Sequence, residues 1–234
     1  YQEQLIDFSV KLDPIQSTAI HPESLFFAFG GSNKYRNERG RDKTTTIYLA
    51  SIASKSIEKI GAHDSRINSL SFSPDGNYLA SSDGNTIKLW AVGIDEDSNM
   101  IVNLIGFIDQ NSYKIKFTPD SNFLLYTSDG AIIFWNILEQ RIEKTIDFAW
   151  NDIRVFDITK NGRLIASTDS SRVVKIWDCW QDEMVAEIEA WNSICLTFSP
   201  DGKLLASGHT TAFGDDYAGQ SIISIWQVPE QYYS

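Results

Sequence analysis

Apolar and polar residues alternate in short runs along this chain, and the runs recur in a fixed order. The clearest copy is the segment INSLSFSPDGNYLASSDGNTIKLW at 67–90. Period-two alternation between turn residues predicts short β-strands, and Ser-Pro-Asp-Gly is typical of a tight turn between two of them. The recurrence predicts a protein built from sequence repeats.

Five copies align on the apolar residue that precedes the tight turn, with successive spacings of 52, 45, 41 and 40 residues. Each copy continues with a second alternating run, a third run that ends in an aromatic residue, and a fourth before the next anchor. Four-stranded units of about 40–45 residues are typical of propeller blades. The anchors are Ile20, Phe72, Phe117, Ile158 and Phe198.

Three motifs resemble those of the WD40 family. They are Gly-Ala-His at 61–63, Phe-Ser-Pro-Asp-Gly at 72–76 and 198–202, and Trp177-Asp178 at the end of one repeat. The resemblance covers nearly the whole chain, and the regular Ser-Pro-Asp-Gly and Leu-Ala-Ser-Gly phrases look like those of prokaryotic WD40 arrays, which are commonly part of larger multidomain proteins. It implies blades of four strands, a to d, in which strand a lines a central channel and the d–a and b–c loops form the top face.

The repeats also depart from the family pattern. Only the second keeps the family's His, at His63, only the fourth keeps the Trp-Asp pair, and Tyr48 replaces Trp in the first. We therefore expect the buried His-Ser-Asp-Trp network of the family to be incomplete in every blade, so that apolar packing carries most of the stability.

The two ends of the sequence carry complementary parts of one blade. Residues 4–10, QLIDFSV, are typical of an outer d strand, and residues 221–228, SIISIWQV, of a c strand that lacks its d strand. Pairing them would remove exposed strand edges. The predicted fold is all-β: a WD40-like β-propeller of five four-stranded blades, closed by the N-terminal strand pairing into the last blade. A fragment of a larger seven-bladed ring is the alternative.

We treat residues 1–234 as a single β-propeller domain. Because the sequence begins at Tyr1 without a signal-peptide pattern, we expect it to come from a longer protein. The predicted blades cover residues 14–63, 64–108, 109–148, 149–190, and 191–228 together with 4–10.

Charge narrows the class of partner. The chain has 31 acidic and 20 basic residues, a net charge of -11 and a pI near 4.7, which argues against general binding to nucleic acid or an anionic membrane. Cys179 and Cys195 fall in different predicted blades, so we expect no disulfide between them. With no N-x-Ser/Thr sequon either, the expected setting is the cytoplasm.

A search for chemistry finds no phosphate-binding loop, nucleophile elbow or zinc motif, so we predict no catalytic residue, cofactor or metal. The three histidines cannot share an ion, because His21 belongs to a bottom turn whereas His63 and His209 belong to top loops. The enzymatic alternative is a glycosidase-like hydrolase with carboxylates at the channel. Asp152 and Asp157 are its candidates, but both lie in one blade.

Two long b–c connections and several tryptophans suggest a binding surface instead. Residues 33–43 are basic and residues 211–220 are acidic and aromatic. Trp150 and Trp191 occupy similar d–a loops, where they either bind a partner or cap the groove between blades, whereas Trp180, in a c–d turn, is expected to be buried against its blade. Tryptophan and arginine are enriched where binding energy concentrates.

The sequence thus predicts a non-catalytic protein-interaction scaffold or sensor module. Its partner is expected to be another protein or an effector domain of the same larger chain. The oligomeric state is not predicted. The predicted partner-binding residues of the top face are Arg36, Arg39, Trp150, Trp191, Asp215, Asp216 and Tyr217.

Overall fold

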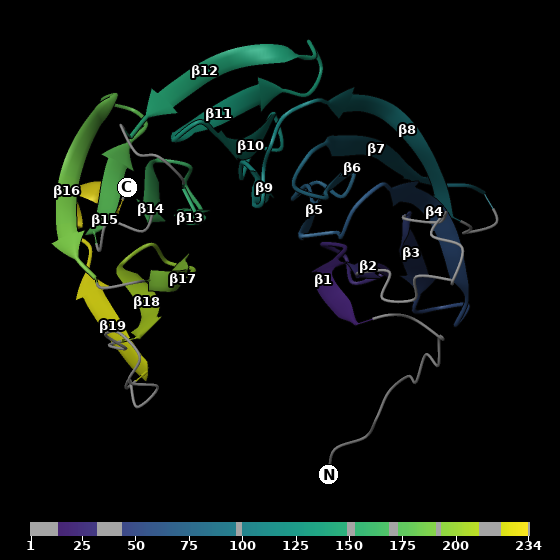
Figure 1. Cartoon of the computed structure of the whole chain (residues 1–234), viewed down its shortest axis with the longest axis horizontal. Helices are drawn as coiled ribbons and strands as arrows, with labels where there is room; N and C mark the ends of the chain where they lie inside the picture. Colours follow the sequence, from purple (N-terminus) through teal and green to yellow (C-terminus); the bar gives the residue numbers. More distant parts are fainter. Residues whose placement is uncertain are drawn as a thin grey trace. The chain divides into compact units, whose positions relative to one another are not determined.

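The strands of the protein follow the predicted repeat (Figure 1). The computed structural model describes residues 14–31, 44–96, 100–148, 153–168, 173–190, 193–210 and 221–233. These residues contain 19 strands and one short 3-10 turn, Glu230–Tyr232. Within the described ranges, no helix has the length and apolar character needed to cross a membrane. The prediction of an all-β, propeller-type fold is confirmed.

The strands form five antiparallel sheets, in each of which hydrogen-bonded neighbours are consecutive in sequence. The first contains β1 (Ile15–Ile20), β2 (Phe26–Gly31), β3 (Thr45–Ser51) and β4 (Ile57–His63). The second contains β5 (Ser69–Phe72), β6 (Tyr78–Ser82), β7 (Ile87–Ile94) and β8 (Met100–Ile108). The third contains β9 (Ile115–Phe117), β10 (Phe123–Ser128), β11 (Ala131–Asn136) and β12 (Arg141–Asp147). The fourth contains β13 (Val155–Ile158), β14 (Leu164–Thr168), β15 (Val173–Asp178) and β16 (Glu183–Glu189).

The fifth sheet has three strands in the part of the chain that the structure describes. They are β17 (Ser193–Phe198), β18 (Leu204–Thr210) and β19 (Ser221–Gln227). The strand expected to complete this sheet, residues 4–10, lies outside the described residues. Closure by that strand therefore stays a prediction.

The chain divides into two compact units, residues 1–117 and 118–234. In each unit, the alternate apolar residues that the sequence pattern assigns to one face of a strand are buried. The core of the first unit includes Phe26, Leu49, Leu79 and Trp90. The second unit has two clusters, one around Leu125, Phe156 and Ile165 and the other around Leu164, Ile176 and Leu205.

All five turns between the first and second strands have the same backbone hydrogen bond. In the second sheet the N–H of Gly76 donates to Ser73 O at 2.9 Å, and the equivalent bonds in the other sheets measure 2.7–2.9 Å. Each anchor residue of the sequence alignment is the last residue of the first strand. The alignment is therefore confirmed, including the divergent copies AIHPES and ITKNGR.

The shared turn requires a positive φ at its fourth position. Gly76, Gly162 and Gly202 take φ values of 77°, 75° and 71°, which glycine tolerates without steric cost. Ser24 and Ser121 take φ values of 57° and 62° at the same position without glycine. The turn geometry is therefore kept even where its sequence signature is lost.

Side chains also link the innermost strands of neighbouring sheets within each unit. In the first unit, the Leu70 N–H donates to Ser17 Oγ at 2.9 Å, and the Ile115 N–H donates to Ser69 Oγ at 3.4 Å. In the second unit, the N–H of Phe198 in β17 donates to the carboxylate of Asp157 in β13 at 2.7 Å. These bonds satisfy backbone groups that have no partner within their own sheet.

Candidate functional site

All seven residues predicted to bind a partner fall outside the described residues. They are Arg36, Arg39, Trp150, Trp191, Asp215, Asp216 and Tyr217. The predicted top-face surface remains a prediction. The side chain of His209 also lies outside the described residues, whereas His21 lies in the first a–b turn, as expected.

A buried polar network joins the strands of the second sheet to the end of β4. Ser81 Oγ accepts a hydrogen bond from Trp90 Nε1 at 3.0 Å and lies 2.8 Å from His63 Nε2. The Nδ1 of His63 is 3.6 Å from Asp83 Oδ2. Thr86 Oγ1 lies between the two, 3.3 Å from His63 Nδ1 and 3.3 Å from Asp83 Oδ1. The second blade therefore brings all four residue types of the His-Ser-Asp-Trp network together, and the prediction that every blade lacks at least one of them is wrong.

The error came from the expected position of the acid. The prediction sought it in a Trp-Asp pair such as Trp177-Asp178, whereas Asp83 comes from the turn between β6 and β7. Its Oδ1 accepts the N–H of Asn85 at 3.0 Å and that of Thr86 at 2.8 Å. The carboxylate is thus fixed by its own turn and is available to orient the imidazole.

The environment keeps His63 neutral and Asp83 charged. Burial lowers the pKa of His63 to about 4, and the nearby Asp83 offsets only part of this effect. For Asp83, burial works against ionisation, but hydrogen bonds from the backbone of Thr86 and Asn85 outweigh it, so the pKa of Asp83 lies below its ordinary value. Because buried His63 takes up a proton less readily in the folded chain than in the unfolded chain, the free energy of unfolding depends on pH.

Acid should weaken the fold through His63. Because the pKa of His63 is about 4 in the folded chain and 6.5 ordinarily, the unfolded chain binds the proton first as the pH falls. The stabilisation is complete above the ordinary pKa and is lost as the pH drops towards 4. We expect the free energy of unfolding to fall by about 2 kcal/mol between pH 7.5 and pH 5. Urea denaturation at the two pH values measures this loss, and an identical pH dependence in His63→Gln would contradict it.

The channel acid of the enzymatic alternative is engaged in structural hydrogen bonds. Asp157 is buried, its Oδ2 accepts the Phe198 N–H at 2.7 Å, and its Oδ1 accepts the Ile158 N–H at 2.9 Å. A carboxylate held in this way is poorly placed for proton transfer to a substrate. Asp152 lies outside the described residues. Among the residues that the structure describes, no group of three or more His, Cys, Asp or Glu side chains could hold a metal.

Cys179 and Cys195 are both free, as predicted. Burial raises the pKa of Cys179 to about 12, so this thiol stays protonated and unreactive at neutral pH.

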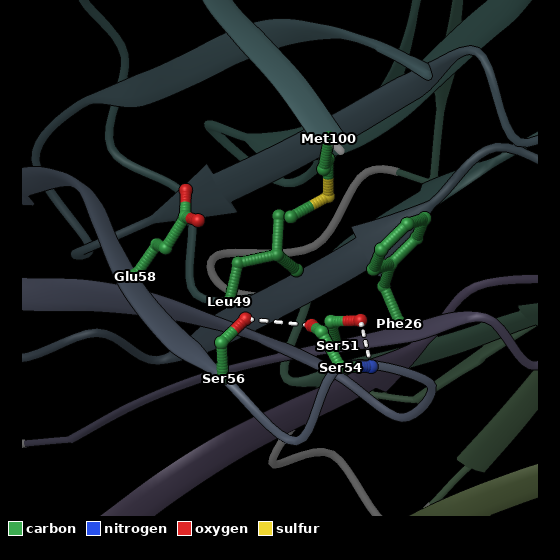
Figure 2. Close-up of a pocket in the computed structure, with 7 residues that line it drawn as sticks. All are labelled: Phe26, Leu49, Ser51, Ser54, Ser56, Glu58 and Met100. Carbon is green, nitrogen blue, oxygen red and sulfur yellow. Dashed lines mark hydrogen bonds between the residues drawn. The ribbon is translucent and has the colours of Figure 1, made fainter. Parts of the chain in front are cut away.

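A small cavity in the first unit is too small for a ligand. Its volume is about 20 Å³, enough for about one water molecule. Figure 2 shows Met100 of β8 reaching towards Leu49 of β3, beside Ser51 at the end of β3 and two serines of the turn that follows it. Ser54 Oγ lies 2.8 Å from Ser56 Oγ, and the Ser54 N–H donates to Ser51 Oγ at 3.2 Å. The cavity is therefore a packing feature.

A surface groove in the second unit is large enough for a ligand. Its volume is about 450 Å³, within the range of small-molecule sites. The a–b turns of the third and fourth sheets line it, together with a c–d turn that follows β15. Its apolar lining includes Pro119, Phe123, Phe134 and Trp180, and its charged lining is Asp120 and Lys160.

Trp180 is fixed in this groove although the residue is 59% exposed. The guanidinium carbon of Arg163 lies 5.0 Å from the centre of the indole ring and 5.0 Å from that of Tyr232. Asp178 fixes the turn, because its Oδ1 accepts the N–H groups of Trp180 at 2.9 Å and Gln181 at 3.2 Å. The prediction that Trp180 is buried is wrong: its ring packs on Arg163 instead of entering the apolar core.

Arg163 holds this arrangement together. Its Nε donates to Asp178 Oδ2 at 3.0 Å, and its Nη1 donates to Gln231 O at 2.7 Å. The Asp178 side chain is fully buried. Sequence reasoning missed Arg163, although a signal was present: the residue after the a–b turn is Asn77 or Asn122 in two repeats but Arg163 in the fourth.

A second hollow of about 260 Å³ adjoins the groove and shares Lys160 and Asn161 with it. The a–b turns of the fourth and fifth sheets line it, together with Tyr233. The Nζ of Lys203 lies 5.6 Å from the centre of the Tyr233 ring. We call the two hollows together the turn groove, defined by Pro119, Asp120, Lys160, Asn161, Trp180, Asp201 and Tyr233.

The turn groove lies in the acidic half of the chain. Residues 118–234 include 17 acidic and 8 basic residues, whereas residues 1–117 include 14 acidic and 12 basic residues. For Asp120, burial opposes ionisation, but hydrogen bonds from Thr118 and Asn122 lower its pKa below the ordinary value. A hydrogen bond from Ser199 likewise lowers the pKa of Asp201. Both carboxylates are charged at neutral pH and outnumber the one lysine that lines the two hollows, Lys160, so the groove and the acidic half of the chain around it favour cationic ligands.

A comparison with family models identifies the repeats. The model described as WD domain, G-beta repeat, matches residues 54–91 and 183–217. The first match contains the network of His63, Ser81 and Trp90. The chain contains WD40 repeats at these two places. The sequence motifs that resemble the family therefore lie in a fold of the corresponding type.

Solved structures support the WD40 fold. Sqt1 from Chaetomium thermophilum, in complex with the N-terminus of ribosomal protein L10, superposes with a TM-score of 0.73 at 18% identity, covering 95% of this chain and 62% of that one. Another Sqt1 structure gives 0.68 at 19% identity over 84% of this chain and 55% of that one. Hydrazine synthase from Kuenenia stuttgartiensis superposes with a TM-score of 0.68 at 15% identity, covering 98% of this chain and 67% of that one.

These identities establish likeness of fold alone. The WD40-repeat chain spans 55–62% of the length of these two Sqt1 chains. A search of curated protein sequences gave no significant match.

Proposed function

We propose that this WD40-repeat chain is a non-catalytic protein-interaction module that binds an extended, basic segment of a partner protein in the turn groove. Trp180 carries the proposal, because its indole is largely exposed and yet held in one position by Arg163. Tryptophan is the residue type most enriched where binding energy concentrates. A side chain that is already ordered loses little conformational entropy when a partner docks.

Charge supports a basic partner. The second half of the chain has a net charge of -9, and the turn groove carries ionised Asp120 and Asp201. Opposite charge accelerates encounter with a Lys- or Arg-rich segment and fixes its orientation, and salt weakens both effects. The solved complex of Sqt1 with the N-terminus of a ribosomal protein supports a chain segment as the kind of partner.

The proposal extends to the wider role predicted from the sequence. The module would act as a scaffold or sensor in the cytoplasm, for a separate protein or for an effector domain of the same larger chain. The top-face residues, from Arg36 and Arg39 to Tyr217, form a second proposed surface. Trp150 and Trp191 would supply its aromatic contacts.

Trp180→Ala tests the groove. We expect this variant to lose about 30-fold in affinity for the strongest binder from an array of random short peptides, a loss equal to about 2 kcal/mol of binding energy. Leu138→Ala is the matched control, because Leu138 is 80% exposed in the c–d turn of the third sheet and does not line the groove. Fluorescence anisotropy measures affinity, and circular dichroism verifies the fold of both variants.

Two results would contradict the proposal. Equal affinity of Trp180→Ala and the native chain would remove the groove as the site. In that case, a loss confined to a Trp150→Ala, Trp191→Ala double variant would move binding to the top face. An array on which the native chain retains no peptide would count against an interaction function altogether.

A further inference from the structure

The turn groove offers a partner no strand edge. Three a–b turns line it, and each is closed by its own backbone hydrogen bond of 2.9 Å. The lining residues that belong to strands are Phe123 of β10 and Phe134 of β11, and both strands are paired on either side. A segment that adds to a sheet needs unpaired N–H and C=O groups along a strand. The groove must therefore recognise a segment through side chains.

The ring of Trp180 already carries a cation on one face. The guanidinium carbon of the buried Arg163 lies over the ring, 5.0 Å from its centre. Because Arg163 covers one face, the exposure of the indole comes from the opposite face and the edges. One bound cation draws the π electrons of the ring towards itself, and Lys160 lines the same hollow. A second cation on the open face is therefore disfavoured, and a neutral apolar group is favoured there.

The walls beside Trp180 are apolar and largely aromatic. Pro119, Phe123 and Phe134 line the hollow together with Trp180. The rings of Phe123 and Phe134 pack edge to face, with centroids 6.0 Å apart and an interplanar angle of 70°. Grooves lined by aromatic rings are the kind that accept proline-rich segments. Proline also loses little conformational freedom on docking, because its φ is already fixed.

Two side-chain donors at the groove suit the backbone of such a segment. A polyproline II helix makes no internal hydrogen bonds, so its carbonyl groups remain available to donors. Asn161 Oδ1 accepts the Thr159 hydroxyl at 2.7 Å and the Arg163 N–H at 3.1 Å, so the oxygen of this amide is engaged within its own turn. Among the described residues, no group accepts a hydrogen bond from the Asn161 NH2 or from the indole N–H of Trp180. Both side chains line the hollow.

Asp120 adds a negative charge at the same hollow. Its Oδ1 accepts hydrogen bonds from the Thr118 hydroxyl and the Asn122 N–H, whereas its Oδ2 accepts one bond from the described residues, from Asn122 Nδ2 at 2.8 Å. A carboxylate oxygen has room for two hydrogen bonds, so Oδ2 can also accept one from a Lys or Arg side chain. The excess of acidic residues in 118–234 attracts a segment that carries such a cation.

We propose that the turn groove binds a proline-containing segment in the polyproline II conformation, with a proline ring on the open face of Trp180 and a neighbouring Lys or Arg paired with Asp120. The inference rests on the proposed function and specifies the class of segment that the groove takes. The aromatic surface complements the proline ring, the two donors complement the unpaired carbonyl groups, and the carboxylate complements the cation.

An array of random short peptides tests the proline. We expect the peptides that the native chain retains to be enriched in proline beside Lys or Arg. In the strongest binder, replacing that proline with alanine should lower the affinity about tenfold. Trp180→Phe should keep most of the affinity, whereas Trp180→Leu, which offers an apolar side chain without a flat ring, should lose about 30-fold. Fluorescence anisotropy measures the affinities, and thermal midpoints verify the fold of both variants.

Asp120→Asn tests the paired cation, with Asp75→Asn as its matched control. Asp75 occupies the same position of the a–b turn in the second sheet and does not line the groove. Asn161 shows that this turn keeps its hydrogen bonds with asparagine at that position. We expect Asp120→Asn to lose about fivefold in affinity for the strongest binder, but not for the same peptide with glutamine in place of its basic residue. Asp75→Asn should bind both peptides as the native chain does.

The failure of this inference can be told from the failure of the proposed function. Retained peptides without enrichment in proline, or equal affinity after its replacement by alanine, would overturn the inference even where Trp180→Ala still lost affinity. Equal binding by Trp180→Leu and Trp180→Phe would also overturn it, since apolar contact alone would then suffice. Equal losses in Asp120→Asn and Asp75→Asn would overturn the pairing with Asp120. If Trp180→Ala bound as tightly as the native chain, the inference and the proposed groove would both fall.

Discussion

Replacing Arg163 with methionine is expected to lower the free energy of unfolding by about 3–5 kcal/mol. The side chain of Asp178 is fully buried, so removing its partner leaves an unpaired charge in the interior. The substitution also removes the hydrogen bond to Gln231 and the ring contacts with Trp180 and Tyr232. Urea denaturation measures the loss, and a domain stability of about 5–15 kcal/mol makes it a large fraction of the total.

The double variant Arg163→Met, Asp178→Asn is the control. It removes both charges but keeps an oxygen that can accept the N–H groups of Trp180 and Gln181. We expect it to be more stable than Arg163→Met alone, since the cost comes from the orphaned carboxylate. A loss below about 1 kcal/mol in the single variant, or equal losses in the two, would show that this ion pair does not stabilise the fold.

Ser81→Ala should lower the free energy of unfolding by about 2–4 kcal/mol. Its hydroxyl is the hydrogen-bond partner of both Trp90 Nε1 and His63 Nε2, and the serine is fully buried. Alanine fills nearly the same space but leaves two buried polar atoms without partners. Thermal and urea unfolding of the variant measure the effect.

Ser167→Ala is a control supplied by the repeat itself. Ser167 occupies the position of Ser81 in the fourth sheet and is equally buried, but its Oγ has no hydrogen-bond partner among the described residues. Removing that hydroxyl should leave stability unchanged or raise it by up to about 1 kcal/mol, because a buried unsatisfied group disappears. Equal losses at the two serines would mean that the network of the second blade does not stabilise the fold.

The repeat could be predicted from the sequence because its periodicity is local. Strand alternation and turn residues depend on neighbours a few positions away, and every anchor from Ile20 to Phe198 ends a first strand. Even the Ile158 copy, with Thr-Lys-Asn-Gly in place of Ser-Pro-Asp-Gly, was placed correctly. The apolar run on each side fixed its register although the turn signature had changed.

The side-chain clusters could not be predicted in the same way. Asp83 reaches His63 from a different turn, and Arg163 contacts Asp178 and Tyr232 across 15 and more positions. Such contacts depend on how strands lie side by side, which a motif search does not address. Trp180 is a second example. The sequence predicts its position in a turn, but its contact with Arg163 can be seen only in the folded structure.

The hydrogen bonds that join the first strands of neighbouring sheets differ in strength. We therefore expect neighbouring sheets to differ in how strongly they resist separation. The links at Ser17 and Ser69 end on neutral hydroxyls, whereas the β17–β13 link ends on a carboxylate at 2.7 Å. Hydrogen bonds to an ionised acceptor are roughly twice as strong as neutral ones. Among the described residues, the link at Asp157 should therefore resist separation of its two sheets more strongly than the links at Ser17 and Ser69.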